Sequence, residues 1–404
     1  MSAQDQASPV LKVGMIGLGR AAVSMIPSFV KSPYFQLAAA SDLNRQALER
    51  FSKDFGAEAF TRVEDLCKSA NVDAVYIATP HQFHMEHATI AAKHGKHIIL
   101  EKPMALTLDD CDAINKMVDA SGVKLVVGHT HSFGRPILKM REIVKAGKLG
   151  ELKMIHSFNY TDFLYRPRRP EELDTSKGGG IIFNQVPHQI DTIRLIGGGM
   201  VKSVRAYTGV WDSRRPTEGS MTAFLEFENG ACATVLYSGY DHFDSDEFCE
   251  WIGEGGRTKQ PDLQGSARKK LQGNPTDEAK LKADTGYGGN SQEGHSSRQT
   301  TENGYHQHFG VTIASCEKGD IRPSKSGLVI YGDDGKQEIP IPVGAAIPDK
   351  EKVLDELYEA VIHDKTPIHN GHWGKATMEV CLAILESGRS KKEVYLAHQV
   401  PVAD

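Results

Sequence analysis

The sequence predicts two domains. The first is an amino-terminal α/β domain with a doubly wound parallel sheet, and the second is an α+β domain with a large, mostly antiparallel open sheet. Three observations support this: 404 residues exceed what one hydrophobic core usually spans. Short apolar runs alternate with helical patterns in the first third of the chain. Strand-like runs then follow one another without intervening helices. We place the domains at residues 8–133 and 134–404.

Composition and charge exclude several classes of protein. The formal net charge of -5 gives no electrostatic reason to expect nucleic acid or an anionic membrane as a partner. The 6 cysteines show no paired spacing, which favours free thiols in a reducing compartment and argues against a metal site. The polar start lacks the apolar segment of a signal peptide, and no apolar run reaches the roughly 18 residues that span a bilayer. We therefore expect a cytoplasmic protein.

A dinucleotide-binding motif follows the first expected strand. Residues 11–16 read as that strand and continue into G-x-G-x-x-A at residues 17–22, with a helix expected from about residue 21 to 31. The glycines allow a tight turn and a close approach of a diphosphate, and the helix offers its positive end to the phosphates. The expected cofactor contacts from this turn are Gly17, Leu18, Gly19, Arg20 and Ala21.

An acidic residue follows the second expected strand, which covers residues 36–41. Asp42 lies at the spacing from the glycines that is typical of a carboxylate bonded to the adenosine ribose. This acid favours NAD, because a carboxylate would repel a 2′-phosphate. Arg45 is nearby and could receive such a phosphate, so NADP remains an alternative.

Residues 97–103, HIILEKP, place a lysine where chemistry is expected. The apolar half reads as a strand buried on both faces, and Pro103 cannot continue the strand ladder. Lys102 then lies at the carboxyl end of a strand, where open parallel sheets bind ligands. Desolvation there would lower the pKa of its ammonium from about 10.4 towards the range of a general acid or base. The alternative is a structural lysine paired with Glu101.

Neighbouring strands end in further polar residues. The strand at residues 74–78 ends in Thr79-Pro80-His81, and the strand at residues 124–128 is followed by His129. Because parallel strands end at one edge of a sheet, these residues should lie near Lys102. The further expected cofactor contacts are Thr79, Pro80, His84, Glu101 and Lys102, with His129 on the substrate side.

The segment TPHQFHMEHATIAAKHGKHIILEKP, residues 79–103, resembles one shared by the glucose–fructose oxidoreductase, inositol dehydrogenase and rhizopine-catabolism (Gfo/Idh/MocA) family. The resemblance implies a dinucleotide-dependent oxidoreductase whose lysine contributes to substrate binding and proton transfer. It also implies a second domain whose open sheet covers the substrate and mediates subunit association. We therefore expect a homodimer or homotetramer that acts on a small molecule.

A second chemical stretch, GGGIIFNQVPHQID, covers residues 178–191. Its spacing places Asn184, His188 and Asp191 on one face of a helix. The glycines would allow that helix to begin close to a ligand. The alternative is a solvated polar face, or a buried histidine satisfied by Asp191. At this place family members have a sequence similar to GGGxxxDxxxHxxD, whose aspartate and histidine lie beside the catalytic lysine. An amide cannot take a proton, so we assign Asn184 to positioning and leave the base to His188 or Lys102, with Asp191 among the substrate contacts.

Two loops of the second domain complete the prediction. FLYRPRRP, residues 163–170, carries guanidinium groups that suit an anionic substrate such as a dicarboxylate; the alternative is a solvated loop or subunit contact. These candidate substrate residues are Arg166, Arg168 and Arg169. Residues 256–304 are poor in apolar side chains, and we expect a long flexible insertion there.

Three segments narrow the expected reaction. DFLYRPRRPEELDTSKGGG, HFGVTIASCEKGDIRPS and GHWGKATMEVCLAILESGR are similar to family members that oxidise the cis-dihydrodiol of phthalate. The resemblance implies hydride transfer from a ring carbinol to nicotinamide while Lys102 or His188 takes the hydroxyl proton. The product would tautomerise to 4,5-dihydroxyphthalate. The alternatives are a sugar, inositol, polyol or glycoside dehydrogenase, and a non-catalytic dinucleotide sensor.

Overall fold

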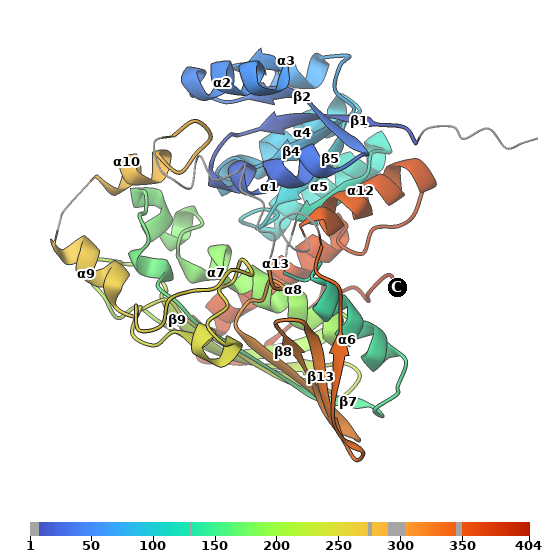
Figure 1. The fold of residues 1–404 in the computed structure, drawn as a ribbon, viewed down its shortest axis with the longest axis vertical. Coiled ribbons are helices and arrows are strands. Elements are labelled where there is room, and N and C mark those ends of the chain that lie inside the picture. Colours follow the sequence, from blue (N-terminus) through green and yellow to red (C-terminus); the bar gives the residue numbers. More distant parts are fainter. Residues whose placement is uncertain (1–7, 129–130, 274–276, 290–303, 345–349) are drawn as a thin grey trace, which may run out of the picture.

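The computed structural model describes residues 8–128, 131–273, 277–289, 304–344 and 350–404, and these form two sheets (Figure 1). The first sheet has six parallel strands in the order β3-β2-β1-β4-β5-β6. The second has nine strands in the order β14-β13-β12-β11-β7-β10-β9-β8-β15. All its neighbouring pairs are antiparallel except β10 with β7. The predicted fold class is confirmed.

Strands and helices alternate through the first sheet. Its elements are β1 (Leu11–Ile16), α1 (Arg20–Lys31), β2 (Phe35–Ser41), α2 (Arg45–Phe55), β3 (Glu58–Phe60), α3 (Val63–Lys68), β4 (Ala74–Ile77), α4 (His84–Lys93), β5 (His97–Glu101), α5 (Leu108–Ser121) and β6 (Leu125–Gly128). Every residue of β4 and β6 is buried, as apolar strands covered by helices on both faces should be. The edge strand β3 was not predicted, because three largely exposed residues give no periodic signal.

The elements of the second sheet follow, with successive strands no longer separated regularly by helices. Its elements are α6 (Arg135–Lys145), β7 (Leu152–Tyr160), α7 (Gly180–Asn184), α8 (Val186–Gly197), β8 (Val201–Gly209), β9 (Ser220–Phe227), β10 (Cys232–Ser238), α9 (Ser266–Gly273), α10 (Glu278–Ala283), β11 (Val311–Cys316), β12 (Gly319–Ser324), β13 (Gly327–Gly332), β14 (Gly335–Pro340), α12 (Glu351–His363), α13 (Gly371–Ser390) and β15 (Val394–Tyr395). Helix α13 packs on β8, and α8 packs on β7 and β10.

Helix α12 returns to the first domain, beside α1 in Figure 1. Leu354 and Leu357 belong to the same buried cluster as residues of β1 and α1. The ring of Tyr358 stacks on Tyr34, with the ring centroids 4.3 Å apart. Residues 351–363 therefore pack with the first domain, although the sequence boundary at residue 133 assigned them to the second.

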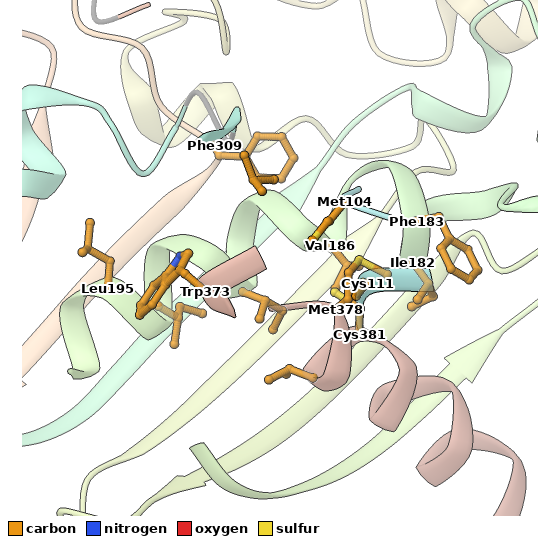
Figure 2. Close-up of a cluster of buried hydrophobic side chains, with 14 of the residues drawn as sticks. Met104, Cys111, Ile182, Phe183, Val186, Leu195, Phe309, Trp373, Met378 and Cys381 are labelled. Atoms are coloured by element: carbon orange, nitrogen blue, oxygen red, sulfur yellow. The ribbon is translucent and has the colours of Figure 1, made fainter. Parts of the chain in front are cut away.

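Helix α8, which carries one of the candidate catalytic residues, is buried along its whole length. Figure 2 shows Val186 of α8 in an apolar cluster with Met378 and Cys381 of α13 and with Met104 from the first domain. A helix surrounded on all sides by the protein has few alternative positions. This packing fixes α8 relative to the carboxyl end of the first sheet.

Candidate active site

One large cavity lies between the carboxyl ends of the parallel strands and helices α7 and α8, with a volume of about 1650 Å³. This exceeds the roughly 300–1,000 Å³ of a typical small-molecule pocket. A cavity of this volume has space for a dinucleotide and a second molecule, and both domains line it. The expected site residues in its lining are Gly17, Gly19, Arg20, Ala21, Asp42, Thr79, Pro80, Glu101, Lys102, Arg166, Arg168, Arg169, Asn184 and His188.

The glycine turn has the geometry that a diphosphate needs. Gly17 has a φ of +88°, and a Cβ there would lie 3.0 Å from the carbonyl of Ala78, so a side chain is disfavoured. At Gly19 a Cβ would meet nothing within 4 Å, because this residue faces the cavity. Helix α1 begins directly after it and presents its amino-terminal end. These residues fit the diphosphate of a dinucleotide.

Asp42 couples the second strand to this turn. One carboxylate oxygen accepts a hydrogen bond from the Leu18 backbone N–H at 2.6 Å, and the other accepts from the Asn44 N–H at 2.7 Å. Leu18, an expected cofactor contact, lies outside the cavity lining: its side chain is buried and its backbone N–H is bonded to Asp42. The carboxylate keeps lone pairs for ribose hydroxyls. Arg45 is exposed and lies outside the cavity lining.

His84 does not contact the cavity, contrary to the expectation of cofactor binding. Its ring is fully buried, with Nδ1 2.8 Å from the carbonyl oxygen of Pro103 and Nε2 2.9 Å from that of Thr79. The imidazole faces inward from the first turn of α4 and ties together the chain segments after β4 and β5. It positions neighbours of the site without touching a ligand. His129 lies outside the described residues.

Lys102 lies directly after β5 and reaches across to the second domain. Its Nζ donates to the backbone carbonyl of Asn184 at 2.7 Å. Burial lowers the pKa of this ammonium, although the carboxylate of Glu101 acts in the opposite direction. Glu101 itself accepts a hydrogen bond from the Tyr76 hydroxyl at 2.5 Å. A lysine in this state can exchange a proton nearer to neutral pH than a solvated one.

The stretch around Asn184 is not the single helix that the spacing predicted. Gln185, with φ -120° and ψ -47°, separates α7 from α8. The Asn184 amide donates to the carbonyls of Gly178 at 3.1 Å and Gly180 at 2.8 Å, which holds the glycine-rich turn. Asn184 and His188 both line the cavity despite this break.

The glycines before α7 permit close packing within the protein, and Gly178 also lines the cavity. A Cβ at Gly179 would lie 2.6 Å from the carbonyl oxygen of Glu172. A Cβ at Gly178 would lie 2.5 Å from the side chain of Leu106. The run of glycines therefore marks a structurally constrained site, and the constraint is close contact between segments of the chain.

Asp191 is fully buried and lies outside the cavity lining, so it cannot contact a substrate. Its Oδ1 accepts from Trp373 Nε1 at 2.6 Å and from the Thr377 hydroxyl at 3.0 Å. His369 Nε2 is 3.5 Å from its other oxygen. The expectation that Asp191 binds substrate is therefore wrong: it holds α8 against α13.

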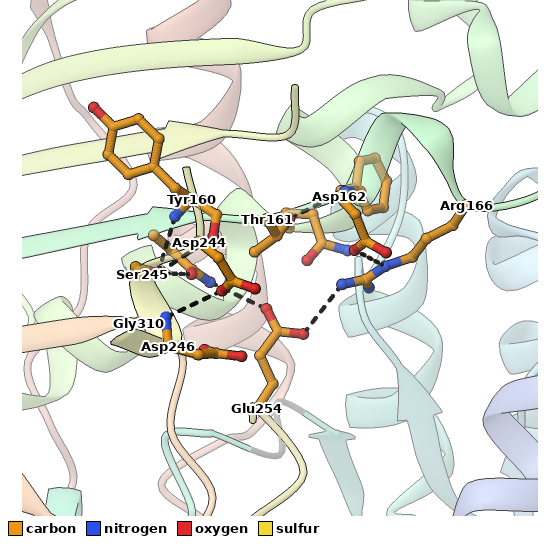
Figure 3. Close-up of polar contacts among 12 residues, drawn as sticks. Tyr160, Thr161, Asp162, Arg166, Asp244, Ser245, Asp246, Glu254 and Gly310 are labelled. Atoms are coloured by element: carbon orange, nitrogen blue, oxygen red, sulfur yellow. Dashed lines mark hydrogen bonds and ion pairs between the residues drawn. The ribbon is translucent and has the colours of Figure 1, made fainter. Parts of the chain in front are cut away.

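The three loop arginines line the cavity, and each contacts protein acceptors. Arg168 donates to the Phe163 carbonyl at 2.7 Å and lies over that ring, which fixes it in the protein. Arg169 pairs with Glu171 at 3.2 Å. Arg166 donates from Nε to Asp162 at 2.7 Å, while its Nη2 is 3.7 Å from Glu254 (Figure 3).

Arg166 is the loop arginine whose guanidinium lies beside Glu254. The Nη2 of Arg166 forms a long ion pair with Glu254, at 3.7 Å. Glu254 and Arg168 are close enough to Lys102 to act on its pKa, Glu254 raising it and Arg168 lowering it. A carboxylate bound to Arg166 would therefore lie near the candidate base.

Several cavity residues were not among the predicted site residues. His131 packs its ring at 4.8 Å from that of His188, and burial lowers its pKa to about 3, so this imidazole is neutral at pH 7. Phe309 lies 4.9 Å from His188. Lys350 precedes α12, and burial lowers its pKa to about 8. The strand end that carries His129 could have pointed to His131, but no motif marks Lys350 or Glu254.

The fold and the cavity together define the chain as an oxidoreductase that uses NAD. Residues 11–129 match the model of the oxidoreductase family with an NAD-binding Rossmann fold, and residues 137–259 match the GFO/IDH/MocA C-terminal domain. The chain belongs to the Gfo/Idh/MocA family of dehydrogenases, as the sequence resemblance indicated.

Relatives of known name agree with this family. The chain is 43% identical to 1-carboxy-3-chloro-3,4-dihydroxycyclohexa-1,5-diene dehydrogenase of Comamonas testosteroni, over 94% of this chain and 95% of that protein. It is 29% identical to myo-inositol 2-dehydrogenase of Thermotoga maritima, over 61% and 74%. A solved dehydrogenase structure from Bordetella bronchiseptica is 46% identical, with a TM-score of 0.90 over 96% of this chain and 100% of that chain. Among the described helices, none has the length and apolar character to span a membrane.

Proposed function

We propose that this dehydrogenase oxidises the cis-4,5-dihydrodiol of phthalate to 4,5-dihydroxyphthalate. Three segments resemble dehydrogenases for that substrate, and the Comamonas relative is named for a carboxylated dihydroxycyclohexadiene. The observation that carries the proposal is the guanidinium of Arg166 in the cavity that Lys102 and His188 line. A guanidinium fork matches a ring carboxylate, which a neutral polyol lacks.

The chemistry needs one proton acceptor and one hydride acceptor. Bound NAD supplies the hydride acceptor at the cavity end of the parallel sheet. The substrate hydroxyl gives its proton to Lys102 or His188. The carbinol carbon gives up its hydrogen together with both electrons of the C–H bond, as a hydride. The hydroxy-cyclohexadienone that results tautomerises to the aromatic diol, which makes the oxidation favourable.

Two features of the protein support proton transfer by Lys102. Burial lowers the pKa of its ammonium, so a larger fraction is neutral at a given pH. Its bond to the Asn184 carbonyl keeps Nζ at the junction of the two domains.

His188 packs against His131 and Phe309, which restricts its ring to the same cavity wall. Asn184 acts by positioning, since its amide is bonded to two backbone carbonyls.

The test is a substrate panel followed by absorbance of reduced cofactor. It contains phthalate cis-4,5-dihydrodiol, a monocarboxylated cis-dihydrodiol, an uncharged cis-dihydrodiol, myo-inositol and a methyl glucoside. The proposal expects the highest kcat/KM for the phthalate diol and a lower value for the uncharged diol. An inert phthalate diol together with rapid oxidation of inositol or the glycoside contradicts it.

A pair of arginine variants tests the proposed carboxylate contact. Arg166→Gln should lower kcat/KM for carboxylated diols by about 10- to 100-fold, as expected for a lost charged hydrogen bond, and leave uncharged diols within about threefold. Arg141→Gln is the control, because Arg141 also donates from Nε to an aspartate, Asp404, at 2.8 Å, but lies outside the cavity lining. Equal losses on charged and uncharged diols would contradict a carboxylate contact.

A polyol dehydrogenase is the second candidate, favoured by the inositol dehydrogenase relative. It would use the same lysine and histidine, and Arg166→Gln would affect its substrate little. We further propose that the enzyme acts in the cytoplasm as a homodimer or homotetramer. Light scattering of the purified protein measures that state, and a monomer at micromolar concentration contradicts it.

A further inference from the structure

The insertion expected to be flexible contains an ordered segment that crosses the cavity. We call residues 277–289 the strap; it consists of α10 and the turn that follows. Ala279, Lys282, Ala283 and Thr285 line the cavity together with the glycine turn of the first domain. Figure 1 shows α10 beside the first sheet, although its sequence neighbours belong to the second domain.

The strap's carboxy-terminal end is attached to the glycine turn itself. The Tyr287 backbone N–H donates to the Leu18 carbonyl at 2.9 Å. A Cβ at Gly286 would lie 3.3 Å from the same oxygen, so the two backbones are in close contact. The strap therefore packs on the backbone of the turn expected to hold the diphosphate.

Tyr287 anchors this end by its side chain as well. Its ring is buried between Phe51 and Phe55 of α2, with centroids at 5.5 and 6.2 Å. Its hydroxyl donates to Asp54 at 2.6 Å, and the Arg50 guanidinium lies 5.9 Å from the ring centroid. An aromatic ring buried with a satisfied hydroxyl is a strong local anchor.

The strap's amino-terminal end is attached to the arginine loop. The Glu278 carboxylate accepts two hydrogen bonds from Arg215, at 2.9 and 3.0 Å, and one from the Arg168 backbone N–H at 2.9 Å. Lys282 pairs with Glu172. The strap thus connects the substrate-side loop to the glycine turn across the opening between the domains.

We infer that the strap is part of the dinucleotide site: it covers the glycine turn and retains bound NAD(H), so that the cofactor leaves only when Tyr287 is released from α2. The inference concerns the cofactor and holds for any substrate. It assigns to Tyr287 a positioning role: Tyr287 is part of the cavity lining, but its ring packs on Phe51 and Phe55 and its hydroxyl is bonded to Asp54, which holds the strap on α2.

The experiment measures the dissociation rate of NADH from the full-length protein. NADH is displaced by excess NAD in a stopped-flow instrument, and the nicotinamide fluorescence is followed. Tyr287→Ala should accelerate dissociation about tenfold or more, as for a loss of about 1.4 kcal/mol, and Tyr287→Phe should do so less. Glu278→Gln should also accelerate it, because it weakens the strap's other end.

Lys280→Ala is the matched control, since this exposed lysine lies on the same helix outside the cavity lining. Dissociation from Tyr287→Ala within about twofold of the Lys280→Ala rate overturns the inference. Hydrogen exchange of the wild-type protein gives a second test that needs no variant. The strap amides should exchange more slowly when NADH is bound, and unchanged exchange there with protection at the glycine turn overturns the inference.

Discussion

Replacing Lys102 by methionine tests the proposed proton transfer. The substitution keeps an unbranched stem of similar volume and removes the ammonium that donates to the Asn184 carbonyl at 2.7 Å. General acid–base catalysis contributes about 10²- to 10⁴-fold, so kcat/KM should fall by that factor. The lost hydrogen bond costs about 1.5–3 kcal/mol, but the variant no longer buries a charge, and these two effects oppose each other. The melting temperature should therefore change by only a few degrees.

The assay compares steady-state rates with NADH affinity in the same preparations. NADH binding by fluorescence titration should change less than about threefold in Lys102→Met, since the glycine turn is untouched. Lys96→Met is the control, because Lys96 also donates from Nζ to backbone carbonyls, those of Ser69 at 2.9 Å and Val72 at 2.6 Å, outside the cavity lining. A Lys102→Met variant that keeps more than a tenth of wild-type kcat/KM would refute transfer through this lysine.

Three further predictions follow from the site. If Lys102 is the base, it must be neutral to act, so kcat/KM should rise with pH and fall as pH drops through the pKa of Lys102. Because that pKa is lowered, kcat/KM should reach its plateau below about pH 10.5; a flat pH profile contradicts this. Gly19→Val should keep the melting temperature and weaken NADH binding about 10- to 100-fold, because its side chain enters cavity space; unchanged affinity in a titration contradicts this. Asp191→Asn should cost about 3–5 kcal/mol in urea unfolding, because it breaks a buried pair with His369; a loss below about 1 kcal/mol contradicts this.

The pairing of His369 adds a pH dependence with a definite sign. Burial opposes its charge, but Glu356 and Asp191 outweigh burial and raise its pKa above 6.5. The stabilisation is therefore complete below the unfolded pKa near 6.5 and is lost as pH rises through the raised value. In Asp191→Asn this loss should shrink, as measured by unfolding free energy from pH 6 to 9. An unchanged pH dependence would exclude Asp191 as a source of the shift.

Local signals made the first domain predictable. The strand, glycine turn and helix of residues 11–31 agree with the structure within one residue, because the turn requires glycine and apolar periodicity marks the elements on either side. Lys102 could likewise be assigned to a strand end, since Pro103 stops the ladder. Such features depend on a few consecutive residues and so are visible in one sequence.

The rest of the site depends on contacts between distant segments. Asp191 lies one turn beyond His188 on α8 and is bonded to Trp373 and Thr377 of α13, which the helical spacing does not reveal. His84 has the expected position but turns inward to two carbonyls. The strap is attached to Leu18 by one backbone bond and to α2 by Tyr287, and its polar composition suggested only flexibility.

The most direct test is a crystal structure with NAD and the aromatic diol product. We expect Lys102 Nζ and the His188 ring within hydrogen-bond distance of the same product hydroxyl, with a ring carboxylate on Arg166. A product whose hydroxyls contact neither Lys102 nor His188, or whose carboxylates lie away from Arg166 in solvent, would contradict it.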